Sequence, residues 1–250
     1  MLSERDNSIL VKIFDPEAQP ESSARISANA VPLPGIPIDL FGELATRERR
    51  TLQPLNQDFP TPERIHQAIK ELSSIIKSHP LYASAYVNRA QARRLQIQYD
   101  ELFSPDAESM MVDIFADLDR AVDLAAPLRS LDQISAHQGN LLAAAHTHKG
   151  LLLLRAADIT RGGAPAHGLP PALANMDADV LEEAASHELA SGGRYGNTMA
   201  QQLAVKTNPY AKLCGSIVRE AQRKEILETM RPHTFECVLV LPRCLADRVR

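Results

Sequence analysis

The chain has 250 residues, of which 44% are hydrophobic and 23% charged, so it can bury one good-sized core and is not a disordered chain. Its 27 basic and 31 acidic residues give a formal net charge of −4, which gives no overall attraction to nucleic acid or to anionic membranes. The longest purely apolar run, Leu151 to Leu154, is far shorter than a membrane span. Three cysteines without metal-ligand spacing, and a start that lacks a leader-like apolar region, predict a reduced cytoplasmic protein, with the nucleus as the alternative location.

The first predicted element is a short helix over residues 9–14, where apolar side chains recur four residues apart before Asp15 and Pro16. Residues 22–37 are rich in Ser, Ala and Pro and have no helical period, so they predict a linker that runs extended over the surface. Residues 1–38 therefore form a mostly extended N-terminal segment in our interpretation. Residues 17–38 are also long enough to cross a helical stack and fill its groove, which would make the protein autoinhibited.

Amphipathic helices are predicted next, because Ala, Leu, Arg and Gln dominate and apolar residues recur every three or four positions. A helix over residues 39–55 carries the basic cluster Arg47 to Arg50, which we expect to be solvated. Thr61, Pro62 and Glu63 are a strong helix start, and the apolar stripe that follows predicts a helix to about Ser78. A further helix is predicted over residues 83–95.

Comparison of the chain with itself indicates a two-helix repeat of about 34 residues. Helices over 65–78, 83–95 and 116–124, with Pro80 between the first two, follow the order of such a repeat. A third, weaker copy pairs residues around Gly150 with a helix near 181–185, and the stretched spacing predicts either inserted turns or extra helical length near 96–107 and 127–139. We therefore predict an all-α, TPR-like right-handed superhelix of helix pairs over residues 39–230.

The end of this repeat domain carries a loop and a predicted cap. The glycine- and proline-rich residues 161–171 indicate a surface loop with almost nothing to pack, and no Lys-Ser/Thr pair follows that would indicate phosphate binding. Asn208 and Pro209 predict the start of a C-terminal capping helix that runs to about Thr229. The last segment, 231–250, contains a strand-like run without a partner strand, so we expect a poorly anchored tail.

Three segments, residues 83–95, 117–124 and 208–214, together with residues 9–16, resemble the tetratricopeptide repeat protein 36 family, with the fungal-type members the most similar. The resemblance covers roughly residues 9–16 and 61–229. It implies a three-repeat adaptor without a catalytic centre, linked to Hsp70-type chaperones and to tyrosine metabolism. Repeats that clamp a chaperone's C-terminal carboxylates use Asn, Lys and Arg at set positions, of which only Asn88 matches, since the third-repeat positions hold Ala144 and His148.

The remaining reactive residue types favour structural roles. His146 and His148 are two residues apart on a predicted helix and therefore point to different faces, which disfavours a shared metal ion with His137 or His167. Cys237 and Cys244 lack a His or Asp pattern for nucleophilic or redox chemistry, and Cys214 fits burial in the capping helix. Arg89, Arg93 and Arg94 favour internal ion pairs with the aspartates at positions 117, 119 and 123, and the alternative is that Arg94 faces a groove.

We predict that the concave groove is lined by the first helices of the pairs. The exposed row comprises Ser84, Val87, Asn88, Gln91, Arg94 and Leu95, continued by Thr147, His148 and Leu151. Arg94, Asn88 and Gln91 can hold an acidic or polar peptide, and none of the row has a catalytic partner in the sequence.

The function predicted from these observations is that of a monomeric, non-enzymatic adaptor that binds a protein or peptide, with an Hsp70-type chaperone as the partner that the resemblance implies. We predict no cofactor, no metal ion, no nucleic acid and no membrane as ligand. Two alternatives stay open: an architectural subunit that uses its convex face or its tail, and an enzyme with acid and base groups on the inserted loops, which a strongly shifted pKa in a closed pocket would reveal.

Overall fold

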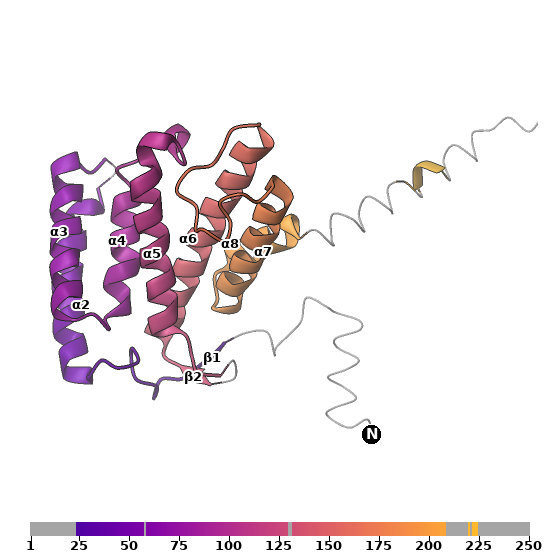
Figure 1. Cartoon of the computed structure of the whole chain (residues 1–250). Helices are drawn as coiled ribbons and strands as arrows, with labels where there is room; N and C mark the ends of the chain where they lie inside the picture. The colour runs from indigo at the N-terminus through magenta and orange to yellow at the C-terminus, as the bar shows by residue number, and fades with distance from the viewer. Residues whose placement is uncertain (1–23, 58, 130–131, 209–219, 221, 225–250) are drawn as a thin grey trace, which may run out of the picture. The chain divides into compact units, whose positions relative to one another are not determined.

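The computed structural model describes residues 24–57, 59–129, 132–208, 220 and 222–224. These residues form helices α2 (Ile38–Leu52), α3 (Pro62–Ser78), α4 (Ala83–Arg94), α5 (Glu108–Ala125), α6 (Ala136–Arg161), α7 (Ala178–Arg194) and α8 (Thr198–Thr207), shown in Figure 1. Short 3-10 turns lie at η1 (Gln53–Leu55), η2 (Tyr99–Glu101) and η3 (Pro105–Ala107). Strands β1 (Arg25–Ile26) and β2 (Gln133–Ile134) pair in parallel. The all-α prediction is confirmed for the described part of the chain.

Local signals explain where α3 begins and which face it buries. The Thr61 side chain caps the helix by accepting from the Arg64 amide at 3.5 Å, and Pro62 occupies the first helical position. Ile65, Leu72 and Ile75 of the predicted stripe are buried. The predicted helix over 61–78 is therefore observed almost residue for residue.

Consecutive helices pack on one another along the chain from α2 to α8, and α4 also contacts α6 (Figure 1). Their shared core is continuous, from Leu72 in α3 through Ala90 and Leu118 to Leu142 in α6 and Leu181 in α7. Helices α6 and α7 approach each other closely: a Cβ atom added at Gly150 would lie 2.7 Å from Leu189 Cγ. A glycine is required there because any side chain would push the two helices apart.

Helix α6 has 26 residues and includes residues 136–139, so part of the stretched spacing is extra helical length, one of the two predicted alternatives. Helix α8 was not predicted at all; the Asn197 side chain caps it by accepting from the Ala200 amide at 3.0 Å. The predicted helix over 9–14, most of the predicted capping helix after Asn208, the tail 231–250 and all three cysteines lie outside the described residues.

The segment 24–37 is anchored, contrary to the prediction of a linker over the surface. Leu33 is completely buried and Ile36 is 7% exposed. Backbone bonds join Ala24 N to Arg194 O at 2.9 Å and Ser27 N to Ile134 O at 2.8 Å, and Ser135 Oγ donates to Pro32 O at 2.8 Å. The segment therefore belongs to the folded unit, because its sparse apolar side chains are spaced to enter the core.

The loop after α6 also packs, so the prediction that residues 161–171 contain almost nothing to pack is wrong. Leu169 is buried, and the His167 amide donates to Phe103 O at 3.0 Å. Gly168 has a φ of +78°, and a Cβ there would lie 2.6 Å from Glu108 O in α5. Glycine permits both this backbone conformation and the close approach to α5.

A search of the described residues finds no helix with the length and apolarity that crossing a membrane requires.

Candidate protein-binding groove

A hollow of about 500 Å³ lies between the C-terminal half of α4 and the middle of α6. Its lining comprises Gln91, Arg94, Leu95, Ala144, Thr147, His148, Leu151 and Asn197. Six of the nine predicted groove residues thus come together in one concavity, although the three at the C-terminal end of α4 and the three on α6 are more than 50 positions apart in the chain. We call this hollow the α4–α6 groove.

Arg94 supplies the positive charge of the α4–α6 groove. Its Nη1 donates to the Ile97 carbonyl at 2.7 Å, and no carboxylate lies within ion-pair distance among the described residues. The favoured prediction of an internal ion pair is therefore wrong for Arg94. Burial therefore lowers the pKa of this guanidinium, with only a small opposing effect from Tyr99. Since Arg94 remains charged at neutral pH, it can bind an acceptor group of a partner.

His148 lies beside Arg94 and is uncharged at neutral pH. Burial, and secondarily the positive charge of Arg94, lower the pKa of His148 to about 4. Its Nδ1 atom is buried and has no hydrogen-bond partner among the described residues. Such an atom is uncommon in folded proteins and marks a hydrogen-bonding capacity that the chain itself does not satisfy.

The rim of the α4–α6 groove is apolar. Leu95 is 49% exposed and Leu151 is 39% exposed, on α4's end and on α6 respectively. Thr147 uses its hydroxyl internally, donating to Ala143 O at 2.6 Å, so it presents little polarity to the groove. The groove therefore combines one cation and the polar Gln91 and Asn197 with two exposed leucines, a composition that can contact both polar and apolar groups of a peptide or helix.

The other three predicted groove residues lie elsewhere. Ser84 and Val87 are buried, at 7% and 4% exposure, and helix α2 covers this part of α4. The Glu48 carboxylate accepts from Tyr82 Oη at 2.9 Å, from Ser84 Oγ at 2.9 Å and from Asn88 Nδ2 at 2.8 Å. On α4, the groove therefore includes only residues of the C-terminal half of the helix. In the N-terminal half, Ser84 and Asn88 already donate to the Glu48 carboxylate of α2.

Glu48 and Asn197 were missed by sequence reasoning. Glu48 stands among Arg47, Arg49 and Arg50, so it was grouped with a solvated basic face, although it is 6% exposed. Asn197 reaches the groove because it caps α8, and the Asn-Thr pair at 197–198 is a capping signal that could have indicated this helix.

The arginines on the opposite side of α4 are engaged internally, as expected for Asp117. Arg89 binds Asp117 with Nε to Oδ2 at 2.9 Å and Nη2 to Oδ1 at 2.6 Å, and Arg93 binds the same carboxylate. Asp119 instead pairs with Lys149 of α6 at 2.6 Å. The contact with Asp117 raises the pKa of Arg89 even though burial opposes it.

The histidines of α6 point to different neighbours. His146 Nδ1 lies 2.7 Å from Glu188 Oε2 of α7, and its ring stacks on Tyr195, whereas His148 faces the groove. Among the described residues, no group of three or more His, Cys, Asp or Glu side chains is arranged to hold a metal ion.

The N-terminal segment does not line the α4–α6 groove in its described part. Residues 24–37 contact the ends of the helices near β2 and the end of α7 (Figure 1), and none of them is among the groove residues. The prediction of a self-filled groove is therefore wrong for residues 24–38, while residues 17–23 lie outside the described part.

Comparison with known proteins gives one informative relative. No family model and no solved structure matches the chain. The resemblance to the tetratricopeptide repeat protein 36 family therefore stays a prediction. Over 239 residues the chain is 41% identical to a protein of Aspergillus fumigatus named "L-tyrosine degradation gene cluster protein hmgX", an alignment that covers 90% of this chain and 93% of the relative. The chain belongs to the family of this L-tyrosine degradation gene cluster protein.

Proposed function

We propose that this protein is a non-enzymatic adaptor of L-tyrosine degradation, which binds a partner protein of that process through the α4–α6 groove. In this proposal α2–α3, α4–α5 and α6–α7 are three degenerate TPR-like helix pairs, and α8 follows them. The relative's name, together with 41% identity over most of both chains, supports the link to tyrosine degradation. The composition of the α4–α6 groove supports the proposal that the protein acts by binding a partner.

The observation that carries the adaptor role is the chemistry of the groove. It joins an unpaired cation, Arg94, to exposed Leu95 and Leu151 in a concavity of about 500 Å³. An apolar side chain of a partner segment fits between the leucines, while a carbonyl or carboxylate binds Arg94. Burial lowers the pKa of His148 to about 4, and no acidic side chain lines the groove beside it, so the described lining offers no acid–base pair.

A chaperone partner bound through a carboxylate clamp is disfavoured by the α2 contact. Asn88, the one residue that matches such a clamp, already donates to Glu48 at 2.8 Å. A partner's C-terminal carboxylate would have to displace this internal one. Binding of an Hsp70 C-terminal peptide therefore has to use Arg94 and the leucines, and an Asn88→Ala substitution tests this through titration calorimetry.

The main test is pairwise binding of the purified full-length protein to each purified enzyme of L-tyrosine degradation, measured by biolayer interferometry. We expect saturable binding to at least one of them. Leu151→Asp places a charge on the rim and should weaken that binding at least about tenfold. The matched control is Leu128→Asp, since Leu128 is fully exposed and does not line the groove.

Two results would contradict the proposal. One is the absence of binding to any of these enzymes at concentrations of tens of micromolar. The other is an equal loss of binding in Leu151→Asp and Leu128→Asp, which would indicate a general effect of added charge. If both variants retain binding, the partner contacts a surface other than the α4–α6 groove.

A further inference from the structure

A second hollow lies between α3 and the segment formed by α2 and η1. Its volume is about 360 Å³, which is within the range of small-molecule sites. It is lined by Arg47, Arg50, Thr51, Pro54, Arg64, Gln67, Ala68 and Glu71. None of these residues belongs to the α4–α6 groove, so this basic hollow is a separate feature.

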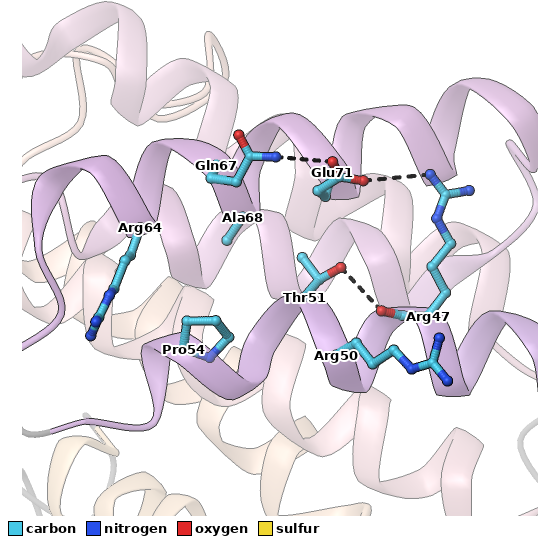
Figure 2. Close-up of a pocket in the computed structure, with 8 residues that line it drawn as sticks. All are labelled: Arg47, Arg50, Thr51, Pro54, Arg64, Gln67, Ala68 and Glu71. Atoms are coloured by element: carbon cyan, nitrogen blue, oxygen red, sulfur yellow. Dashed lines mark hydrogen bonds and ion pairs between the residues drawn. The ribbon is translucent and has the colours of Figure 1, made fainter.

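Charge is placed at the two ends of the basic hollow. Figure 2 shows Arg64 beyond Pro54 at one end and Arg47 with Arg50 at the other, with Thr51 and Ala68 between them. Arg64 and Glu71, which faces Arg47, are seven positions apart on α3, which corresponds to about 10 Å along the helix axis. The hollow is therefore elongated along α3.

Only one of the three arginines is neutralised. Arg47 Nη2 lies 3.6 Å from Glu71 Oε2 and donates to Ser74 Oγ at 3.0 Å. Arg64 donates to the Gln57 side-chain oxygen, a neutral acceptor. Among the described residues, no carboxylate lies within ion-pair distance of Arg64 or Arg50. One uncompensated positive charge thus remains at each end.

The middle of the basic hollow is mainly apolar. Thr51 donates its hydroxyl to the Arg47 carbonyl at 3.0 Å, so its methyl group is the part left to a ligand. Pro54 and Ala68 carry only carbon in their side chains, and Gln67 donates to Glu71 at 3.0 Å. A ligand that fits this surface is apolar in its middle and anionic at both ends.

We propose that the basic hollow binds a linear organic dicarboxylate, with its carbon chain on Thr51, Pro54 and Ala68. One carboxylate binds Arg64 and the other binds Arg50, each through the paired N–H donors of the guanidinium. Both arginines are exposed, so binding is weak and declines with ionic strength. The proposal is independent of the adaptor role, because the two sites share no residue.

The test is titration calorimetry of the full-length protein at low ionic strength with succinate, glutarate and adipate, and with butyrate as the monocarboxylate. We expect one saturable site that prefers one chain length and binds butyrate at least about fivefold more weakly. Arg50→Gln and Arg64→Gln should each weaken the best dicarboxylate about fivefold. Arg49→Gln is the matched control, since Arg49 is an exposed arginine of α2 that does not line the hollow.

Three outcomes would overturn the proposal. They are the absence of saturable heat for every dicarboxylate, equal affinity for butyrate, and equal weakening by Arg49→Gln. A hexaglutamate peptide that binds where the free dicarboxylates do not would also overturn it, and would assign the arginines to contact with an acidic protein segment. Circular dichroism melting of each variant verifies that the fold is retained.

Discussion

Arg93 and Arg94 are neighbours in α4 but lie in different electrostatic surroundings. Arg93 faces α5 and shares the buried Asp117 carboxylate with Arg89, whereas Arg94 faces the α4–α6 groove without an acidic partner. The N-terminal half of the same helix is closed in another way, since Ser84 and Asn88 donate to Glu48 of α2. The polar side chains of α4 that bind a carboxylate of α2 or α5 therefore hold these helices together. Arg94, which has no carboxylate partner among the described residues, is available to a partner protein.

The largest expected effect comes from the closed side of α4. Asp117 is 3% exposed, and Asp117→Ala leaves the Arg89 guanidinium without its carboxylate and leaves Arg93 with only the exposed Asp113. We expect the free energy of unfolding to fall by about 4 kcal/mol, because removal of one partner of a buried ion pair leaves an uncompensated charge. Urea denaturation followed by circular dichroism measures this.

The control for this prediction is Asp113→Ala. Asp113 also pairs with Arg93, at 2.9 Å, but its side chain is 55% exposed. Its loss should cost less than about 1 kcal/mol. Equal effects of the two substitutions would mean that burial does not separate these two ion pairs.

The second-largest loss of stability is expected from the contact between α2 and α4. Glu48→Ala removes the acceptor of three hydrogen bonds and leaves the buried Tyr82 hydroxyl unpaired, so we expect a loss of about 3 kcal/mol in the free energy of unfolding. Burial and the neighbouring Glu48 together raise the pKa of Tyr82, so the hydroxyl stays protonated as a donor. The exposed Glu43, on the same helix, provides the control Glu43→Ala, which should change stability by less than about 0.5 kcal/mol.

The smallest of the three effects concerns the open side and depends on pH. Burial lowers the pKa of His148 in the folded protein to about 4, from about 6.5 for an exposed histidine, so the unfolded chain binds its proton first as the pH falls. The contribution of neutral His148 to the free energy of unfolding is therefore complete above pH 6.5 and declines as the pH falls toward 4. His148→Gln should therefore reduce the difference in unfolding free energy between pH 7 and pH 4.5 by about 2 kcal/mol.

The pH prediction is checked by urea denaturation of both proteins at the two pH values. His66→Gln is the control, because His66 is exposed on α3 and should leave this pH dependence unchanged. A pH dependence that His148→Gln does not alter would show that Arg94 and burial do not hold His148 neutral.

Several features were predictable because their signals are local. Thr61, Pro62 and Glu63 define the start of α3, and its apolar stripe defines the buried face. The pairing of Arg89 with Asp117 was also predictable, since both lie on helices that a two-helix repeat places side by side. Of the candidate site, Gln91, Arg94, Thr147, His148 and Leu151 were correctly placed in one concavity.

Other features depend on contacts that no local signal indicates. Residues 24–37 look like a linker by composition, yet Leu33 is fully buried and Pro32 accepts from Ser135, more than 100 positions away. Leu169 stands in a glycine- and proline-rich loop and is buried because Gly168 permits a close approach to α5. The sequence does not distinguish the buried Glu48 from the arginines beside it, because its burial depends on the contact of its carboxylate with α4.

Local signals in the sequence specify the helical class, the starts of the main helices and the faces that they bury, because capping residues and apolar spacing act within one or two helical turns. Which polar groups find a partner within the protein depends instead on how the helices pack. Asn88 and Arg94 lie on one helix and look equally available in the sequence, but Glu48 of α2 binds Asn88, whereas no carboxylate of the described residues lies within ion-pair distance of Arg94. This difference arises from how the helices pack, since a carboxylate from a distant segment decides whether a donor remains free.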